Sequence, residues 1–375
     1  MFDAIVVGLG GAGSSAAYHL ANRGQRTLGL EQFGPVHSHG SSHGRTRIFR
    51  TAYSEGKEYV PLAQRSQVLW QELQSTSGEK ILEKTGGLYI GRPDNPTVTG
   101  AIESARAYSL EHEILSPAEV ARKFAQFTLE RDEVALWEPA AGALFPENCL
   151  RAYASQAVER GAELHYGEPV ESWTAVSDAV EVRTRSGTYR ARSLVLSVGA
   201  WTSRLARDLS LPLEIERQFV LWFPSRDLSG TGPERMPVFL WNKGPDLHTY
   251  GLPDFGDGVK VGSWAGKVAA RPEAADRVLH EDDAAPIRRF VEQSLRGVLP
   301  RETEHAACLY TNAPDQNFVL GPHPRHSNVT IVSACSGHGF KFASVVGEIV
   351  AQLVCDGRTS HEISFFDPGR FTPRR

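Results

Sequence analysis

Sulfur-containing residues are scarce in this 375-residue sequence, and long apolar runs are missing. The four cysteines lie far apart and form no C-x-x-C pair, which argues against a disulfide framework or a zinc site and fits a reducing compartment. No run approaches the roughly 18 apolar residues of a membrane span. The start, Met1-Phe2-Asp3-Ala4, lacks the charged and apolar regions of a signal peptide. We therefore expect a soluble, cytoplasmic protein that binds no metal.

Blocks of one charge are also missing. Lys and Arg number 40 and Asp and Glu number 44, so the net charge is −4, and the two signs are interspersed. This pattern excludes a nucleic-acid or membrane partner recognised through a basic stripe. With 41% hydrophobic residues and 35 glycines, the composition is that of a globular protein, and the length suggests two domains.

The most informative segment is the first. Residues Ala4–Val7 form a short apolar run typical of a buried parallel strand, and Gly8, Gly10 and Gly13 follow it. In a strand–turn–helix unit these glycines allow the tight turn, the approach of a pyrophosphate and close helix packing. Glu31, at the end of a second strand, can accept hydrogen bonds from ribose hydroxyls. The motif predicts a dinucleotide site without distinguishing NAD from FAD.

Hydrophobic periodicity predicts the other elements. They are a helix over 58–74, a strand over 85–91, a helix over 148–161, a parallel strand at 164–166, a hairpin around Ser186-Gly187, a strand over 194–200, a mostly antiparallel sheet within 216–310, and a strand at 329–332 followed by a Gly-rich turn and a helix. Nucleotide-binding segments thus lie at both ends of the chain and enclose a β-rich region. The fold class predicted is α/β with an α+β second domain, built from discontinuous pieces.

Cations concentrate between Gly40 and Arg50, where His43, Arg45 and Arg47 also occur. If this segment were a helix, Arg47 and Arg50 would share a face and would repel each other unless an anion bound there. A flavin phosphate or a substrate carboxylate would suit paired guanidinium groups. A solvated basic face is the alternative.

Four stretches, in this order, carry a family resemblance. They are Gly40–Leu62, Leu144-Phe145-Pro146-Glu147-Asn148-Cys149, Cys308-Leu309-Tyr310-Thr311 and Ser336-Gly337-His338-Gly339-Phe340-Lys341-Phe342. The chain resembles, over nearly its whole length, the monomeric sarcosine oxidase and N-methyltryptophan oxidase family of covalent flavoprotein amine oxidases. The resemblance implies a Rossmann-like FAD-binding domain from residues 1–84, 145–215 and 312–375. It implies a substrate domain from residues 85–144 and 216–311, whose antiparallel sheet roofs the flavin.

The resemblance also assigns cofactor residues. Cys308 matches the cysteine that holds FAD through a thioether to the flavin 8α-methyl, although by composition alone it could be a small buried hydrophobe, as we interpret the other three cysteines. Gly337 and Gly339 precede a helix whose N-terminus could stabilise negative charge at the flavin N1–C2=O edge. We expect these residues to bind FAD together with Gly8, Gly10, Gly13 and Glu31.

The resemblance also indicates which residues bind the substrate. Arg50 and Lys341 match the two cations that hold the substrate carboxylate, and Tyr250 and His338 match residues of the substrate cavity. Trp264 stands where sarcosine oxidase has a histidine, which changes the volume and polarity of the pocket. The family's His-His pair is Ser42-His43 here, and Arg45 replaces an acid. These departures leave the side chain of the substrate open, and with it the turnover of sarcosine itself.

Lys260 alternates with Val259 and Val261 in a strand pattern, so a solvated lysine is one interpretation. The resemblance places it above the flavin, where a fixed positive charge promotes reaction with O2. Arg47 and His43 match positions beside the flavin, Arg47 as a group that adjusts its electrostatics and His43 as a polar neighbour.

We therefore expect a monomeric FAD-dependent oxidase of a secondary, N-methylated amino acid that forms an imine, then amine and aldehyde, and reduces O2 to hydrogen peroxide. The alternatives are an oxidase of a cyclic imino acid such as pipecolate or proline, a dehydrogenase that passes electrons to a carrier, and a non-catalytic flavin-binding protein. The partners expected are a small amino acid and O2.

Overall fold

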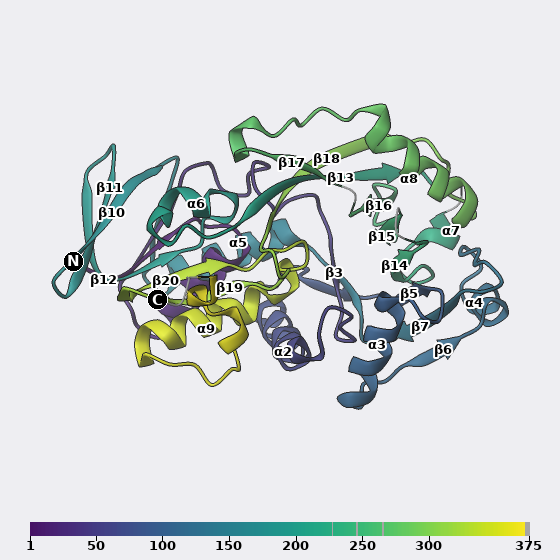
Figure 1. Cartoon of the computed structure of the whole chain (residues 1–375), viewed down its shortest axis with the longest axis horizontal. Helices are drawn as coiled ribbons and strands as arrows, with labels where there is room; N and C mark the ends of the chain where they lie inside the picture. Colours follow the sequence, from purple (N-terminus) through teal and green to yellow (C-terminus); the bar gives the residue numbers. More distant parts are fainter. Residues whose placement is uncertain (227, 245–246, 265, 372–375) are drawn as a thin grey trace.

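A computed structural model describes residues 1–226, 228–244, 247–264 and 266–371 of the chain. Two bodies lie side by side, each built on one large sheet, and the first strand and the last described turn belong to the same body (Figure 1). The expected domain ranges 216–311 and 312–375 each include a few residues outside the described part. The α/β class with a β-rich second body is confirmed.

The first body is built on a sheet of eight described strands. These are β1 (Phe2–Val7), β2 (Thr27–Glu31), β9 (Glu163–Tyr166), β10 (Val170–Val176), β11 (Ala179–Thr184), β12 (Thr188–Leu196), β19 (Val319–His323) and β20 (His326–Ser333). The central pairs β9–β2, β2–β1, β1–β12 and β12–β20 are parallel. Every residue from Ala4 to Val7 is at most 4% exposed, because side chains cover both faces of this sheet.

Helices surround this sheet. They are α1 (Gly11–Asn22), α2 (Val60–Ser77), α5 (Pro146–Glu159), α6 (Thr202–Leu205) and α9 (Ala343–Asp356). Helix α1 contacts both α5 and α9. Its approach to α9 is close at Gly347, where a Cβ atom would lie 2.1 Å from Ser15 Oγ. Small residues at this crossing therefore determine how the helices pack.

The second body is built on a mostly antiparallel sheet. Its described strands are β5 (Gly87–Gly91), β6 (Glu113–Leu115), β7 (Val134–Glu138), β13 (Glu214–Phe223), β14 (Val238–Asn242), β15 (His248–Leu252), β16 (Val259–Ser263), β17 (Lys267–Ala269) and β18 (Glu304–Asn312). Its helices are α3 (Pro96–Ala107), α4 (Pro117–Lys123), α7 (Leu228–Thr231) and α8 (Glu281–Ser294). A core of Phe, Leu and Trp side chains fills the space between sheet and helix α8, for example Phe239, Trp241 and Phe290. The long strands β13 and β18 reach toward the first body, where β18 contacts a 3-10 turn, η2 (Gly199–Trp201) (Figure 1).

A small sheet joins the bodies. Strands β3 (Arg47–Phe49) and β4 (Leu82–Lys84) both pair with β8 (Gly142–Leu144). The interpretation that Arg47 and Arg50 share a helix face is therefore wrong, because residues 47–49 form a strand that pairs with β8. The strand expected over 194–200 is the last part of β12, which continues from the hairpin and ends at Leu196. The remaining described 3-10 turns are η1 (Lys57–Tyr59), η3 (Arg207–Leu209), η4 (Pro272–Ala274), η5 (Phe340–Phe342), η6 (Ser364–Phe366) and η7 (Pro368–Phe371).

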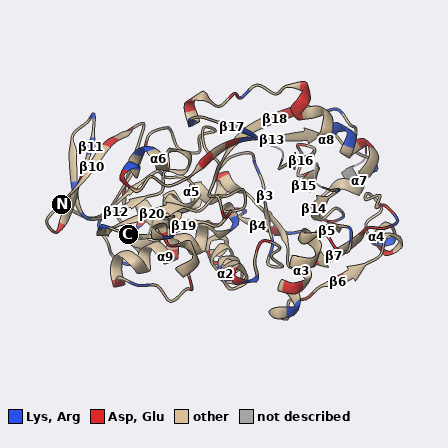
Figure 2. Ribbon diagram, in the orientation of Figure 1, with Lys and Arg blue, Asp and Glu red and all other residues tan. Residues whose placement is uncertain are grey.

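The charged residues are distributed as the composition predicts. Along the ribbon of the described residues, Lys and Arg are interspersed with Asp and Glu over both bodies (Figure 2). Among the described residues, no helix has both the length and the apolar character needed to cross a membrane.

We predict that Gly347→Ala destabilises the first body. The new methyl group would meet Ser15, whose hydroxyl donates to Ser344 O at 3.2 Å and cannot move freely. Overpacking of this kind lowers the free energy of unfolding by about 1–3 kcal/mol, which urea denaturation would measure. Gly34→Ala is the control, since no heavy atom lies within 4 Å of its added Cβ. Equal stability of the two variants would contradict the prediction.

Candidate active site

One cleft brings most of the predicted site residues together. Its lining includes Gly8, Gly10, Glu31, Arg47, Arg50, Tyr250, Trp264, Cys308, Gly337, His338, Gly339 and Lys341. Gly13, His43 and Lys260 are not among the lining residues and lie behind the wall. The cleft therefore joins the β1–α1 turn of the first body to the sheet of the second.

The turn between β1 and α1 matches the dinucleotide motif. Gly8 has a φ of +87°, and a Cβ on Gly13 would lie 1.8 Å from Gly8 O, so only glycine lets the helix sit on the turn. Helix α1 begins at Gly11, and its N-cap residue, Gly10, has no side chain that could bind the N–H groups of the first turn. The N–H of Gly11 donates to Ser42 Oγ at 3.0 Å. This helix N-terminus offers N–H groups and the positive end of a dipole to a pyrophosphate.

Glu31 lies beside this turn and is 5% exposed. Its Oε2 accepts from Leu9 N at 2.8 Å and its Oε1 from Phe33 N at 3.0 Å, while His37 Nε2 lies 3.5 Å from Oε1. A carboxylate has further lone pairs for ribose hydroxyls, and its charge disfavours a 2′-phosphate. The residues at this end of the cleft fit the adenosine half of a dinucleotide.

Cys308 differs from the other cysteines in its charged surroundings. Its Sγ lies 3.4 Å from an Arg47 guanidinium nitrogen and 3.8 Å from His43 Nε2. Burial alone raises the pKa of a thiol, but here Arg47 and His43 outweigh burial and lower the pKa of Cys308 to about 6. Burial raises the pKa of each of the other three cysteines. At neutral pH Cys308 alone is a thiolate, the nucleophilic form.

The other cysteines are not all core residues. Cys149 is buried, whereas Cys335 and Cys355 are partly exposed. Cys335 lines the cleft, and its Sγ accepts from Thr311 N at 3.4 Å. Its interpretation as a core thiol is wrong, because the turn after β20 brings it to the cleft wall.

Two buried cations, Arg50 and Lys341, line the cleft. Arg50 is 2% exposed and Lys341 is 6% exposed, and both lie over the Tyr53 ring, at 4.1 and 5.2 Å from its centroid. Arg50 pairs with Glu55, and Lys341 Nζ donates to His338 O at 2.7 Å. Burial and Arg50 lower the pKa of Lys341. A second anion, such as a substrate carboxylate, would offset the remaining positive charge.

Glu55 has no role in the sequence-based predictions, although it lies inside a motif that carried the resemblance. A second carboxylate without a predicted role is Glu138, from β7, which accepts from Thr51 N at 2.8 Å and from the hydroxyls of Thr51 and Tyr89. It thereby fixes the backbone next to Arg50. No local pattern marks this residue, because it lies 87 positions from Thr51.

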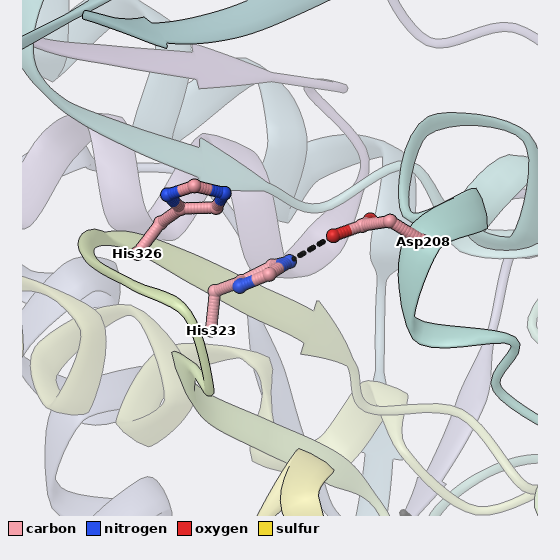
Figure 3. Close-up of side chains that lie close together, drawn as sticks. All are labelled: Asp208, His323 and His326. Carbon is pink, nitrogen blue, oxygen red and sulfur yellow. Dashed lines mark hydrogen bonds and ion pairs between the residues drawn. The ribbon is translucent and has the colours of Figure 1, made fainter.

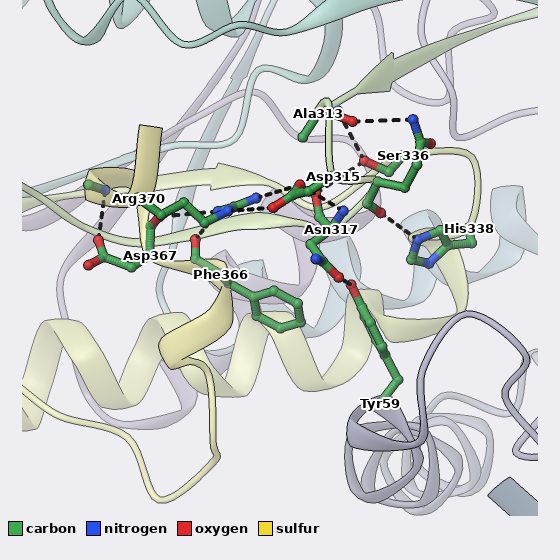
Figure 4. A network of polar contacts seen from close by, with 11 residues as sticks. Tyr59, Ala313, Asp315, Asn317, Ser336, His338, Phe366, Asp367 and Arg370 are labelled. Atoms are coloured by element: carbon green, nitrogen blue, oxygen red, sulfur yellow. Dashed lines mark hydrogen bonds and ion pairs between the residues drawn. The ribbon is translucent and has the colours of Figure 1, made fainter. Parts of the chain in front are cut away.

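His338 is held in one tautomer by its two partners, Gln316 and Tyr53, and it also belongs to the polar network in Figure 4. Its Nε2 lies 3.0 Å from the carbonyl oxygen of Gln316, which can only accept, so Nε2 carries the proton and Nδ1 accepts from Tyr53 OH. Burial lowers the pKa of His338 to about 4, so the ring is neutral. The segment that carries Gln316 is braced by Arg370, which donates to both Asp315 oxygens at 2.9 and 3.1 Å.

Lys260 is 2% exposed, so the interpretation as a solvated lysine is wrong. Its Nζ donates to Gly44 O at 2.8 Å and to Thr46 O at 2.5 Å. Burial and the Arg47 guanidinium lower the pKa of Lys260. The carbonyl acceptors place its charge directly behind the wall that carries Thr46 and Arg47.

Aromatic side chains from the second sheet cover the cleft. The rings of Tyr250 and Trp264 lie 5.6 Å apart, and Trp264 Nε1 would lie 3.8 Å from a Cβ on Gly337. Gly337 has a φ of +76°, and a Cβ on Gly339 would lie 1.8 Å from Ala334 O, so this turn needs glycine twice. The turn aims the N-terminus of η5 and α9 at the cleft, opposite an apolar aromatic roof.

One group of metal-ligand residue types occurs in the described part of the chain, away from the cleft lining. Asp208, His323 and His326 have ligand atoms within 4.8 Å of one another (Figure 3). His323 Nδ1 accepts from Arg325 N at 3.1 Å, so its Nε2 carries the proton that it donates to Asp208 at 2.9 Å. Arg325 also donates to this carboxylate. The Asp208–His323 contact thus ties the β19–β20 hairpin to η3, and the ring centroid of His326 lies 4.8 Å from that of His323.

Comparisons with known proteins agree with this geometry. Residues 3–353 match the model of the FAD dependent oxidoreductase family, DAO. A monomeric sarcosine oxidase of Streptomyces avermitilis is 42% identical over 98% of this chain and 97% of its own. An N-methyl-L-tryptophan oxidase of Yersinia pestis is 33% identical over 99% of both. The solved structure of NikD, an amino acid oxidase of nikkomycin biosynthesis, superposes with a TM-score of 0.87 at 25% identity and covers 98% of this chain and 97% of its own.

We predict that Cys308 in the FAD-free chain is alkylated by iodoacetamide with a midpoint near pH 6, as its lowered pKa requires. Because the thiolate reacts and the thiol does not, the rate rises through that pH. Arg47→Met should move the midpoint upward by more than one unit, since the nearest cation is lost. Peptide mass spectrometry measures the rate, and buried Cys149 serves as the unreactive internal control. An unchanged midpoint in Arg47→Met would show that another group lowers this pKa.

Proposed function

This chain belongs to the FAD dependent oxidoreductase family, and we propose that it is a covalent-flavin oxidase of N-methylated amino acids. The observation that carries the proposal is the cleft itself, which joins a dinucleotide turn, a thiolate cysteine and a pair of buried cations. The resemblance drawn from the sequence motifs is confirmed by the 42% and 33% identical relatives.

The residues present fit FAD. The Gly8–Gly13 turn and the α1 N-terminus would hold the pyrophosphate, Glu31 the ribose, and the Gly337–Gly339 turn one edge of the ring system. We propose that Cys308 forms the covalent link, supported by its lowered pKa and its place on the cleft. When bound, FAD would supply the two-electron chemistry that oxidises the carbon next to the substrate nitrogen and returns the electrons to O2 as hydrogen peroxide.

The substrate carboxylate binds between Arg50 and Lys341. The Arg50 guanidinium supplies a planar fork, and Lys341 supplies a point charge, so the two fix both position and orientation. Glu55 already pairs with Arg50 and is 30% exposed, so it can yield one side of the guanidinium to the substrate. Holding the amino acid at its carboxylate places the N-substituent deeper in the cleft, an orientation effect that lowers the barrier substantially.

His338 contributes as a neutral group. Its Nε2 proton is committed to Gln316 O and its Nδ1 lone pair to Tyr53, so it neither gives nor takes a proton while these bonds hold. The substrate therefore binds with its amine already neutral, which the positive surroundings of Arg50 and Lys341 favour. The imine that forms is hydrolysed by water to amine and aldehyde.

A cyclic imino acid is the second candidate substrate. Trp264 replaces a polar side chain with an indole and forms an apolar wall with Tyr250. Such a wall suits a hydrocarbon ring such as that of pipecolate or proline. A screen of N-methyl and cyclic amino acids, read as peroxide and formaldehyde together, separates the candidates, because only N-methyl oxidation releases formaldehyde. Turnover with an electron carrier but without peroxide would overturn the oxidase assignment.

We further propose a monomer in the cytoplasm. The four cysteines are all unpaired, which is compatible with a reducing compartment. Sedimentation velocity of the purified chain tests the oligomeric state.

We predict that Lys260→Met slows reoxidation of the reduced enzyme by O2 about a hundredfold or more, the cost of removing one electrostatic stabiliser. Its positive charge would stabilise the negative charge that develops on O2. Anaerobic reduction by substrate should change by only a few-fold. Stopped-flow measurement of the two half-reactions checks this, and equal losses in both would remove the assigned role. In the wild type, reoxidation should slow as the pH rises through the lowered pKa of Lys260, where the ammonium loses its proton.

We predict that Arg50→Lys raises KM roughly 10- to 100-fold, because one bidentate charge-assisted contact is worth about 1.5–3 kcal/mol. Steady-state kinetics measures the change. Arg92→Lys, at an exposed guanidinium on the second body, is the control and should leave KM unchanged. If Arg50→Lys leaves KM unchanged, the carboxylate binds elsewhere.

A further inference from the structure

Residues 44–46 form a turn that leads into β3 and Arg47, and the backbone dihedrals of this turn are unfavourable. Gly44 has a φ of +92° and Arg45 a φ of +67°, so two successive residues are left-handed. Glycine adopts this conformation freely, but arginine does not. A non-glycine residue remains in such a conformation only where its surroundings enforce it, and such sites occur near functional groups.

Glu147 stabilises this conformation by binding the backbone N–H groups of the turn. It is the second residue of helix α5 and lies in the 144–149 motif, which has no other role in the site. Its Oε1 accepts from Gly44 N at 2.7 Å and from Arg45 N at 2.9 Å. One carboxylate oxygen thus satisfies two adjacent backbone donors.

Functional side chains hold the carbonyl side of the same turn. Lys260 donates to Gly44 O and Thr46 O, and Arg47 donates from Nη1 to Thr46 O at 2.8 Å and from Nη2 to Ser41 O at 2.9 Å. The same Nη2 lies 3.4 Å from Cys308 Sγ. We propose that Glu147 is a positioning residue that holds this turn so that Arg47 meets the Cys308 sulfur and Lys260 finds its acceptors.

A simpler role for Glu147, as the ion-pair partner of Arg45, does not match the contacts. The Arg45 guanidinium turns outward, where it donates to Glu304 and lies 3.5 Å from Asp257. The Glu147 carboxylate binds the Arg45 backbone instead. Glu304 therefore offers a matched control, because it holds the side chain of the turn and not its backbone.

The groups that face Cys308 come from several elements. Arg47, His43 and Lys260 lower the pKa of its thiol, and the hydroxyl-bearing Tyr250 and Tyr310 also interact with it. Of the three cations, Arg47 directly follows the turn and donates to Thr46 O, and Lys260 donates to Gly44 O and Thr46 O. Loss of the turn geometry should therefore weaken both effects on Cys308.

The test uses the full chain from a riboflavin-starved host, in which Cys308 carries a free thiol. The pH midpoint of its alkylation by iodoacetamide is measured by peptide mass spectrometry. Glu147→Ala should raise the midpoint by at least one pH unit, toward that of an ordinary thiol. Glu147→Gln keeps an oxygen acceptor and should shift it by less than half as much, and Glu304→Gln should not shift it.

Two results would overturn the proposal. One is a wild-type midpoint in Glu147→Ala with a normal far-UV circular dichroism spectrum. The other is an upward shift in Glu147→Gln as large as in Glu147→Ala, which would show that an oxygen acceptor at this position does not hold the turn. Should Glu147→Ala fail to fold, Glu147→Asp replaces it, because its shorter side chain cannot reach both N–H groups; an unchanged midpoint there overturns the proposal equally.

The inference rests on the proposed function only in linking this thiol to FAD. A second measurement follows covalent incorporation of FAD added to the same preparations, which Glu147→Ala should slow at least several-fold relative to Glu304→Gln. If the wild type incorporates no FAD, the covalent link is wrong, while the alkylation midpoints still decide the role of Glu147. Equal incorporation rates in Glu147→Ala and Glu304→Gln would count against the positioning role.

Discussion

Positive charge buried where the two bodies meet is the constraint on which the site depends. Arg50, Lys260 and Lys341 are each at most 6% exposed. A buried cation is costly unless acceptors or anions surround it. Each cation therefore has its own partner. Arg50 pairs with Glu55, Lys260 donates to backbone carbonyl groups, and Lys341 donates to the carbonyl oxygen of His338. These partners in turn specify the loops that bring them together.

The same constraint explains how one cleft combines distinct chemistry. At one end, backbone N–H groups and a helix dipole would attract the pyrophosphate of the proposed cofactor. In the middle, Arg47 and His43 lower the pKa of Cys308 to about 6, which favours the thiolate. At the other end, Arg50 and Lys341 would bind the proposed carboxylate. Burial strengthens each interaction, because water does not screen charges inside the protein.

Much of this arrangement follows from local sequence. The β1–α1 turn, the strands over 87–91 and 326–333, and the helices α2, α5 and α9 agree with the patterns that predicted them. Arg47 and Arg50 show where local sequence fails to predict structure. Their spacing would place them on one face of a helix, but pairing with β8 makes residues 47–49 a strand. Lys260 is a second example. The strand alternation predicts that its side chain points away from Val259 and Val261, but it does not predict whether that side is solvent or protein.

The dinucleotide turn, the family and most residues of the cleft could be predicted without a structure, because they depend on short spacings and on residue types. Three contacts could not: Glu147 binds a turn 102 residues away, Glu138 binds Thr51, and Lys260 binds Thr46 behind the wall of the cleft. Those contacts join segments from different parts of the chain. They form only when the two sheets and their loops pack, and no periodicity within one segment reports them.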